Sequence, residues 1–98
     1  MADTGRMSLD CMHFVYIIRS QVNNKTYTGS TSVGVEKRLH QHNIGSNKWT
    51  KSNGPFELVY YETYVCKQDA ILREKFYKSG IGKQIKKLIL ENFNTKRV

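Results

Sequence analysis

Two short segments rich in β-branched and aromatic residues, separated by a turn, constrain the fold of this chain more than any other feature. Phe14–Ile18 has the composition of a strand that is buried on both faces. Residues 21–25 include two Asn residues, which are typical of a turn, and Thr26–Gly29 has the composition of a second short strand. The sequence therefore predicts a β-hairpin, which a small chain must cover with further elements to bury its apolar residues.

Helix and strand patterns alternate after the hairpin. We expect a helix that starts near residue 34 or 35, a polar loop over 46–55, a strand over 56–65, a helix over 67–78 and a last helix over 81–89. Thr31 and Ser32 are candidate N-caps of the first helix, and Gly45 is its expected C-cap. Gly80 and Gly82 interrupt the helical pattern ahead of the last helix.

The last predicted helix carries a regular apolar repeat. Ile81, Ile85, Leu88 and Ile89 stand at positions i, i+4, i+7 and i+8, which is typical of the apolar face of a helix that packs on a core. The complete order of elements is β-β-α-β-α-α. We therefore predict an α+β fold in which a three-stranded antiparallel sheet is flanked by helices.

The length of 98 residues is that of one domain. We assign residues 1–12 to a flexible N-terminal arm, 13–93 to the domain and 94–98 to a C-terminal tail. No apolar run approaches the roughly 20 residues that span a bilayer, and the arm lacks the apolar segment of a secretory signal. Cys11 and Cys66 are too few for a disulfide framework or a cysteine-based zinc site. These features predict a cytoplasmic protein without a membrane partner.

The charge balance points to a polyanionic partner. The chain has 16 Lys and Arg against 8 Asp and Glu, a net charge of +8, which indicates nucleic acid or, less often, an anionic membrane as the partner. In the helix over 67–78 we expect three basic side chains to contact it: Arg73, Lys75 and Lys78. In the polar loop, Lys48 and Lys51 flank Trp49, a pattern suited to phosphate contacts and base stacking. Trp49 is equally well explained as a lid on the core.

Tyr16 and Tyr27 lie one on each arm of the predicted hairpin. A phenol on a strand can offer its hydroxyl to a reaction while its ring packs on the sheet. Gly29 removes a side chain where the chain leaves the sheet, so a nucleic-acid substrate or another backbone can approach closely. The alternative is structural, because tyrosine is common in strands.

Three polar residues farther along the chain complete the set of candidates. Arg38 and His42 are four residues apart and share one face of the predicted helix, where Arg suits a phosphate and His can carry a proton. Glu74 lies in a basic stretch, where it can pair with Lys78 or hold one hard divalent cation. A solvent-exposed helix face and a surface ion pair are the alternatives for these positions.

Considered together, these residues follow the order of known nuclease motifs. Val15-Tyr16-Ile17, then Tyr27-Thr28-Gly29, then Arg38, His42 and Glu74 resemble the motifs of the GIY-YIG nuclease superfamily. The chain is similar to its small stand-alone members of the UPF0213 type, and to the nuclease domain of the bacterial excision-repair incision protein. The first motif departs from Gly-Ile-Tyr, and Thr28 stands where Ile is usual.

The resemblance implies a metal-dependent endonuclease that hydrolyses phosphodiester bonds during repair, recombination or related processing, with DNA favoured over RNA as the substrate and RNA left open. Glu74 would hold one Mg²⁺ or Mn²⁺ ion, and Arg38 would stabilise the charge of the transition state. Tyr27 would activate the attacking water with Tyr16 as its partner, and His42 would accept a proton or hold a phosphate.

Two other functions stay open at this point. One is a nucleic-acid-binding module on the same fold that no longer cuts, and the other is an adaptor whose basic face meets an acidic protein. We expect a monomer or a weak dimer, which an unidentified protein recruits to its substrate.

Overall fold

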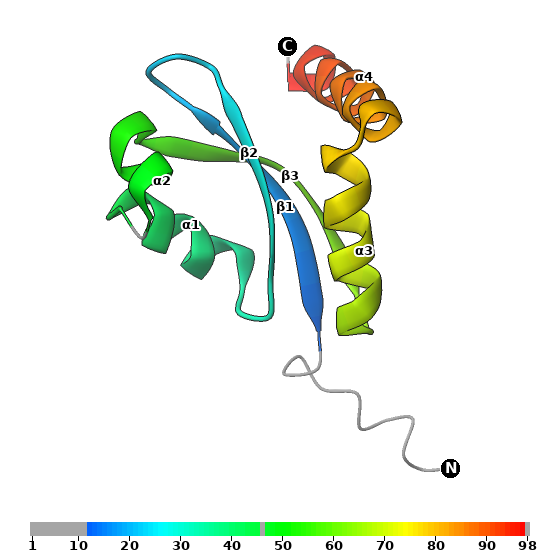
Figure 1. Ribbon diagram of the computed structural model, residues 1–98. Coiled ribbons are helices and arrows are strands. Elements are labelled where there is room, and N and C mark those ends of the chain that lie inside the picture. The colour runs from blue at the N-terminus through cyan, green and yellow to red at the C-terminus, as the bar shows by residue number, and fades with distance from the viewer. Residues whose placement is uncertain (1–11, 46, 98) are drawn as a thin grey trace.

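The computed structural model describes residues 12–45 and 47–97, with side chains described as far as residue 92. The predicted N-terminal arm therefore lies, except for its last residue, outside the described residues. A three-stranded antiparallel sheet forms the centre of the fold, with the order β2-β1-β3 (Figure 1). Its strands are β1 (His13–Ser20), β2 (Thr26–Thr31) and β3 (Phe56–Tyr64). The sheet has two edges, and β2 forms one of them.

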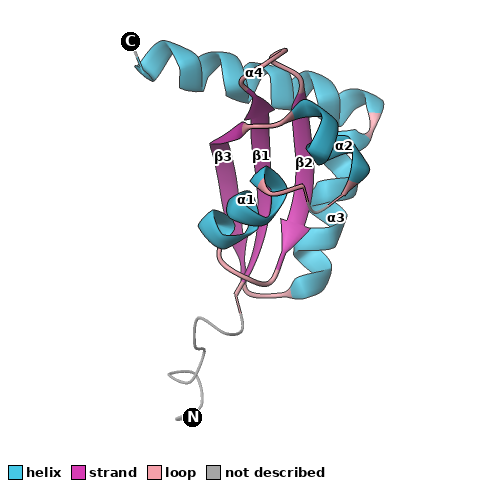
Figure 2. Cartoon of the chain, turned by 90° about the vertical axis from the view of Figure 1, so that its left-hand side faces the viewer, coloured by secondary structure: helices cyan, strands magenta, loops and turns pink. Residues whose placement is uncertain are grey.

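Helices cover both faces of the sheet (Figure 2). On one face lie α1 (Val35–Asn43) and α2 (Lys48–Asn53), and on the other lie α3 (Lys67–Lys78) and α4 (Gly80–Arg97). The predicted α+β class and the predicted order of strands and long helices are confirmed, with α2 as an additional short helix. Helix α4 continues through 94–97, which we had assigned to a tail.

The alternation of side chains along β1 builds the core on both faces. Tyr16 and Ile18 point to one side and pack with Phe56, Val35 and Leu39 beneath α1 and α2. The residues between them point the other way: Val15 packs with Ala70 and Tyr77, and Ile17 packs with Val59 and Leu90. All four of these β1 side chains are at most 2% exposed, which confirms that the strand is buried on both faces.

The prediction of a polar loop over 46–55 is wrong for residues 48–53, which form the helix α2. Asn47 caps this helix: its side chain accepts a hydrogen bond from the backbone N–H of Thr50, and the Thr50 hydroxyl accepts one from the Asn47 N–H. This capping box supplies the helix start locally, without the apolar periodicity by which we recognised the other helices. Ser46 lies outside the described residues.

The ends of α1 also differ from the prediction. Its N-cap is Gly34, which makes no side-chain capping bond, so Thr31 and Ser32 are not the caps. The last helical residue is Asn43 and the C-cap is Ile44, so Gly45, the expected C-cap, stands one position beyond the cap with a φ of +84°. Glycine adopts this left-handed conformation without the cost that a side chain imposes, so Gly45 stops the helix from continuing.

Three of the four residues in the apolar repeat of the last helix face outward rather than onto the sheet, and the fourth, Ile89, packs against the Val15, Ala70 and Tyr77 cluster. Ile81, Ile85 and Leu88 are 68%, 38% and 61% exposed. The side of α4 that meets the rest of the molecule instead carries Leu90, which packs on β3, and Gly82, where a Cβ atom would lie 1.6 Å from the Phe76 carbonyl oxygen. The closeness of the backbones at Gly82 fixes which face of α4 turns inward.

A partly buried carboxylate ties α3 to β3. Glu62 accepts hydrogen bonds from the hydroxyls of Tyr60, Tyr64 and Tyr77 and from the guanidinium of Arg73. Burial alone would raise the pKa of Glu62, but these hydrogen bonds outweigh it and lower the pKa. This cluster holds the position of α3, and with it the residues that α3 presents to β2.

None of the helices in the part of the chain that the structure describes has the length and hydropathy of a membrane span.

Candidate active site

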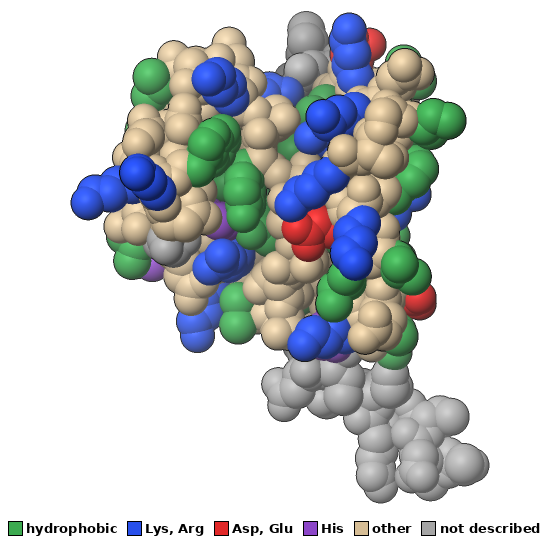
Figure 3. Space-filling model, in the orientation of Figure 1, with side chains coloured by type: hydrophobic (Ala, Val, Ile, Leu, Met, Phe, Trp, Pro, Cys, Tyr) green, Lys and Arg blue, Asp and Glu red, His purple; other side chains and the backbone are tan. Residues whose placement is uncertain are grey.

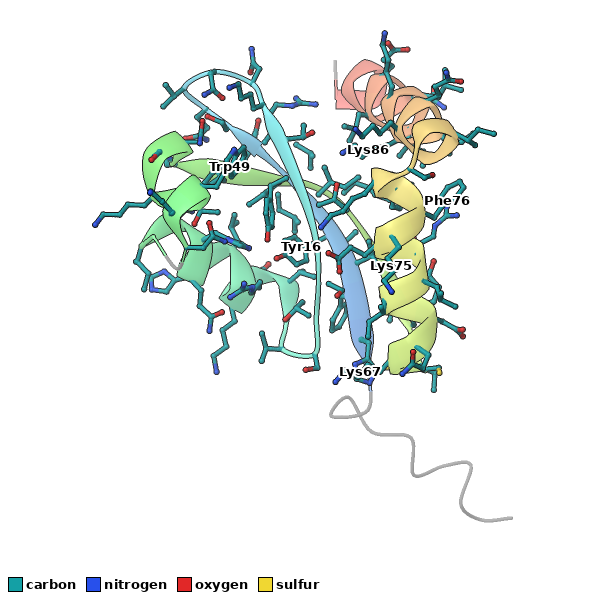
Figure 4. All side chains as sticks on the ribbon, viewed as in Figure 1. Tyr16, Trp49, Lys67, Lys75, Phe76 and Lys86 are labelled. Atoms are coloured by element: carbon teal, nitrogen blue, oxygen red, sulfur yellow. The ribbon has the colours of Figure 1, made fainter. Side chains whose placement is uncertain are left out.

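The edge strand β2 brings together residues from the two helical layers. Its register places Tyr27 and Gly29 on the face toward α1, opposite Ile18 and Tyr16 of β1. The residues between and beside them, Thr28 and Ser30, point to the α3 and α4 side, where they meet side chains of those helices. Figure 4 shows Trp49 and Lys86 approaching β2 from opposite sides. Two sets of candidate residues therefore meet at one sheet edge.

On the α1 side, Tyr16, Arg38 and His42 form one hydrogen-bonded group. The Tyr16 hydroxyl lies 2.7 Å from His42 Nε2, and Arg38 Nε donates to the same hydroxyl at 3.4 Å. Tyr16 and His42 are fully enclosed, at 2% and 0% exposure. The sequence correctly predicted that Arg38 and His42 share a helix face, and the structure brings both to the phenol of Tyr16.

Burial determines the protonation of this group. Burial, followed by the nearby charge of Arg38, lowers the pKa of His42 to about 4. His42 is therefore neutral at pH 7, and its Nε2 can accept a hydrogen bond from the Tyr16 hydroxyl. Burial likewise raises the pKa of Tyr16, although Arg38 opposes that shift. Tyr16 thus remains a neutral phenol that shares a hydrogen bond with His42 and accepts one from Arg38.

Gly29 makes this arrangement sterically feasible. It lies opposite Tyr16 in the sheet, and a Cβ atom at Gly29 would stand 2.4 Å from the Tyr16 hydroxyl. The phenol therefore crosses the strand where the side chain is missing. The close approach that the sequence predicted at Gly29 is that of Tyr16, and a contact of Gly29 with nucleic acid remains a prediction.

Tyr27 lies beside this group with a different environment. Its ring meets the His42 ring edge-on at 5.0 Å between centroids and stacks on Trp49 at 5.5 Å. Among the described residues, no hydrogen bond reaches the Tyr27 hydroxyl, in contrast to that of Tyr16. Trp49 also stacks on Phe56 at 5.6 Å and packs against the core cluster of Tyr16, Ile18 and Phe56. This placement matches the lid on the core that we kept open for Trp49.

On the other side of β2, Glu74 of α3 lies against the strand. Its Oε1 accepts a hydrogen bond from Ser30 Oγ at 2.6 Å, and its Oε2 forms an ion pair with Lys78 Nζ at 2.7 Å. The Lys78 ammonium also lies 6.0 Å from the centroid of the Tyr27 ring. Lys78 therefore connects the acidic group on one side of the strand with the aromatic group on the other.

The donor set at Glu74 fits one hard divalent cation. The described residues contain no group of three or more His, Cys, Asp or Glu that could enclose a metal ion. A Mg²⁺ ion does not need one, because it commonly takes one or two carboxylates and keeps several waters and substrate phosphate oxygens as ligands. The Glu74 side chain is 23% exposed, so a hydrated ion can reach its carboxylate, with the Ser30 hydroxyl beside it.

A basic cavity of about 310 Å³ lies at the start of β2, and it is lined by Lys78, the ion-pair partner of Glu74. Its lining includes Tyr27 and Trp49 from one side and three lysines from the other: Lys78, Lys83 and Lys86. Lys86 donates to Thr28 Oγ1 at 3.0 Å, and burial, then the charges of Lys83 and Lys78, lower the pKa of Lys86. Crowded positive charges of this kind create a potential that attracts an anion.

Figure 3 shows this charge distribution on the surface. Over the layer of α3 and α4, Lys and Arg side chains gather around one acidic group. Sequence reasoning did not assign Lys83 and Lys86 to the site. They belong to the basic stretch that we noted, but only the packing of α4 shows which of its lysines face β2.

The other predicted nucleic-acid contacts are more dispersed. Lys48 and Lys51 are exposed on α2, away from Glu74, and Lys75 is on α3 (Figure 4). Arg73 does not join the group at β2, because its guanidinium donates to Glu62 and to the hydroxyl of Tyr77. The structure therefore brings Tyr16, Tyr27, Arg38, His42, Glu74 and Lys78 together, and leaves the remaining basic residues outside this cluster.

Comparisons with known proteins agree on one family. A family model described as the GIY-YIG catalytic domain matches residues 12–88. A UPF0213 protein of Staphylococcus epidermidis is 41% identical over 80 residues, which cover 81% of this chain and 95% of that protein. The UPF0213 protein YazA of Bacillus subtilis is 33% identical over 85 residues, 86% of this chain and 84% of that protein.

A solved structure belongs to the same group of proteins. The solution NMR structure of the UPF0213 protein BH0048 from Bacillus halodurans is 31% identical to this chain. The match covers 80% of this chain and 82% of that protein, with a TM-score of 0.47.

Proposed function

Because this chain belongs to the GIY-YIG family, as one of its small UPF0213-type members, we propose that it is an endonuclease that hydrolyses phosphodiester bonds with the help of a divalent metal ion. The family is one of nucleases, which generally use divalent ions and act on nucleic acid. The observation that carries the proposal for this chain is the convergence at β2. Arg38 and the two tyrosines lie on one side of the strand and Glu74 on the other, so all can reach one phosphodiester at that edge.

We assign Glu74 as the residue that would hold the ion, Mg²⁺ or Mn²⁺, with Ser30 fixing its carboxylate. When bound there, a divalent ion would neutralise negative charge that develops on the phosphate and its leaving oxygen. In the structure the Lys78 ammonium is paired with Glu74 Oε2, where the ion would bind. On this proposal the ammonium moves to a phosphate oxygen when substrate is present.

Arg38 binds and stabilises the reacting phosphate. Its Nε is held by Tyr16 and its Nη1 donates to Gln41 Oε1 at 2.7 Å, so the guanidinium is fixed before substrate arrives. A donor that is positioned in advance needs no reorganisation when charge develops, which makes it effective in catalysis. Tyr16 and His42 are, on this assignment, positioning residues.

Tyr27 is the residue that we assign to the attacking water. Its hydroxyl makes no hydrogen bond with the described residues, and its ring lines the basic cavity, so the hydroxyl is available to hold and orient a water molecule. Tyr16 is less suited to this task because its hydroxyl is already bonded to His42 and Arg38. This assignment keeps the order of roles that the sequence resemblance implied.

We propose DNA as the substrate, in repair, recombination or a related process. The resemblance to the excision-repair nuclease domain supports this choice. The lysines beside Glu74 suit the phosphate backbone of any nucleic acid, and such contacts carry affinity without reading sequence. Cleavage with little sequence preference is therefore expected.

The test is cleavage by the wild type and by Glu74→Gln, a substitution close in shape. Labelled single-stranded, duplex and branched DNA and RNA are each incubated with Mg²⁺, Mn²⁺ or chelator at low salt. We expect metal-dependent cleavage by the wild type that Glu74→Gln loses. The matched control is Glu36→Gln, since Glu36 is exposed on α1, and it should cleave like the wild type. Equal cleavage by the wild type and Glu74→Gln would refute the assignment of Glu74.

A binding module without nuclease activity is the second candidate, and one observation favours it. The Glu74 carboxylate is already neutralised by Lys78, as in a structural ion pair. Such a module would shift DNA in chelator and never cut it. Tight binding of DNA without cleavage under either metal would make this candidate the better description.

A further inference from the structure

A cavity of about 330 Å³ lies beside the candidate site, at the end of β2 away from the basic cavity. It is bounded by the start of β1, the end of β2, α1 and α3. The lining residues are His13, Ser30, Thr31, Ser32, Val33, Arg38, Gln41, Lys67, Ala70 and Ile71. Two of its charged or titratable side chains, those of His13 and Lys67, have no part in the function proposed above.

The polar lining of this cavity consists mainly of hydrogen-bond donors. His13, Arg38 and Lys67 are basic, three consecutive residues from Ser30 carry hydroxyls, and none of the described residues that line the cavity is acidic. Gln41 contributes its amide N–H groups, because its carbonyl oxygen already accepts from Arg38. A cavity of this chemistry favours an anion with several acceptor oxygens, such as a phosphate.

Apolar side chains also line the cavity. Val33, Ala70 and Ile71 stand among the donors, so the occupant should combine a phosphate with a less polar body. The volume stands at the lower end of the range for small-molecule sites, about 300–1,000 Å³. A single nucleotide, which joins a charged phosphate to a less polar sugar and base, meets both conditions.

The cavity is also continuous with the candidate site. Ser30 lines it and donates to Glu74, and Arg38 lines it and donates to Tyr16. A group that fills the cavity therefore lies against the residues to which we assign the chemistry. We therefore expect the occupant to be part of the same nucleic-acid strand as the reacting phosphate, and not a separate ligand.

We propose that this cavity binds the nucleotide next to the scissile phosphodiester, with Lys67 on its phosphate and His13 at its rim, while Arg38 stays on the reacting phosphate at the border of the two sites. The inference rests on the nuclease function proposed above and extends it by naming a second phosphate site. All the polar contacts that the cavity offers suit phosphate and sugar oxygens. The site therefore positions the strand and does not select a base.

The test measures binding of short probes to the full chain in chelator, so that it does not depend on cleavage. ¹⁵N NMR titrations use the dinucleoside phosphate dTpdT, which has only an internal phosphate, and thymidine 5′-monophosphate, which has only a terminal one. We expect dTpdT to shift the amide signals of residues 30–33 and 67–71. Lys67→Met keeps the aliphatic stem and should raise the Kd for dTpdT about tenfold, because it removes a charged contact with the phosphate.

The matched control is Lys37→Met, since Lys37 is exposed on α1 and does not line the cavity. This variant should bind dTpdT like the wild type. The proposal is overturned if the shifts spare residues 30–33 and 67–71, if Lys67→Met binds as tightly as Lys37→Met, or if only the 5′-monophosphate binds there. The last result would make the cavity a site for strand ends.

The two proposals fail in different ways. If dTpdT binds at residues 30–33 and 67–71 but the protein cuts no substrate, the phosphate site is supported and the nuclease function is refuted. Metal-dependent cleavage with no Lys67 effect on dTpdT binding would leave the nuclease and remove the second phosphate site.

Discussion

Gly29→Ala is the substitution that most directly tests how the candidate site is built. The added Cβ atom would lie 2.4 Å from the Tyr16 hydroxyl oxygen and 2.7 Å from its Cζ atom. Both distances are shorter than real Cβ contacts, so either the phenol or the strand must move. The ring has little room to move, because Tyr16 is 2% exposed and its hydroxyl is bonded to His42.

The expected cost has two contributions. Overfilling a packed core costs about 1–3 kcal/mol. Moving the Tyr16 hydroxyl away from His42 breaks a buried hydrogen bond, which adds roughly 1 kcal/mol. We therefore expect Gly29→Ala to lower the free energy of unfolding by about 2–4 kcal/mol. For a domain of this size each ~1 kcal/mol corresponds to a fall in Tm of about 4–8 °C, so the Tm should drop by at least ~8 °C.

The assay is urea unfolding of a double-mutant cycle between Gly29→Ala and Tyr16→Leu. The leucine side chain ends before the atoms that clash, so in that background Gly29→Ala should cost less than about 1 kcal/mol. Gly80→Ala is the control for adding a methyl group, because no atom lies within 4 Å of the Cβ that would be added at Gly80. An equal cost of Gly29→Ala in both backgrounds would show that the phenol does not occupy the space above Gly29.

Four further predictions concern protonation, buried charge and catalysis. The pKa of His42 is about 4 in the folded protein against 6.5 in the unfolded chain, so stability is complete above about pH 6.5 and falls by about 3 kcal/mol as the pH drops to 4. Unfolding free energies at pH 7 and 4.5 check this, and His42→Gln should remove most of the difference. Glu62→Gln should destabilise the protein by about 1.5–3 kcal/mol at pH 7, because Arg73 and three tyrosines lose a charged acceptor. The wild-type advantage over this variant should fade as the pH falls through the lowered pKa of Glu62, and an advantage that grows as the pH falls would contradict the hydrogen-bonding account. Arg38→Ala should slow DNA cleavage about 10²–10³-fold, and single-turnover rates close to wild type would exclude its role on the phosphate. Lys83→Met should weaken DNA binding evenly across sequences and reduce the salt slope by about 1, whereas a changed sequence preference would mean that this lysine reads bases.

The residues of the candidate site could be found in the sequence to the extent that local spacing determines them. Arg38 and His42 are one helical turn apart, which predicts their common face, and the hairpin predicts that Tyr16 and Tyr27 lie on neighbouring strands. The contact between Ser30 and Glu74 joins residues 44 positions apart, and depends on how α3 packs against β2. No local pattern contains that information.

Two of the differences between the predicted and the observed helices, the missed α2 and the orientation of α4, have separate physical causes. Helix α2 lacks apolar periodicity, but Asn47 followed three residues later by Thr50 is a capping pattern that a search for caps, rather than for periodicity, would have found. In α4 the repeat of Ile81, Ile85 and Leu88 correctly indicates a helix. It misleads about orientation, because the inward face is set by the close backbone contact at Gly82, and a glycine has no hydropathy to reveal this.

The composition of β2 follows from its use of both faces. On an interior strand of a three-layer fold both faces would be apolar, yet Thr28 is 4% exposed and carries a hydroxyl. That hydroxyl accepts from Lys86 and so keeps the lysine at the basic cavity, while Ser30 on the same face holds Glu74. Because side chains alternate with a period of two, a shift of one residue would turn Tyr27 toward α3 and both hydroxyls toward α1, separating every candidate residue from its partner. The small Gly29 and the large Tyr16 that crosses it fit only one register, so the pair that shapes the site also fixes the strand on which the site depends.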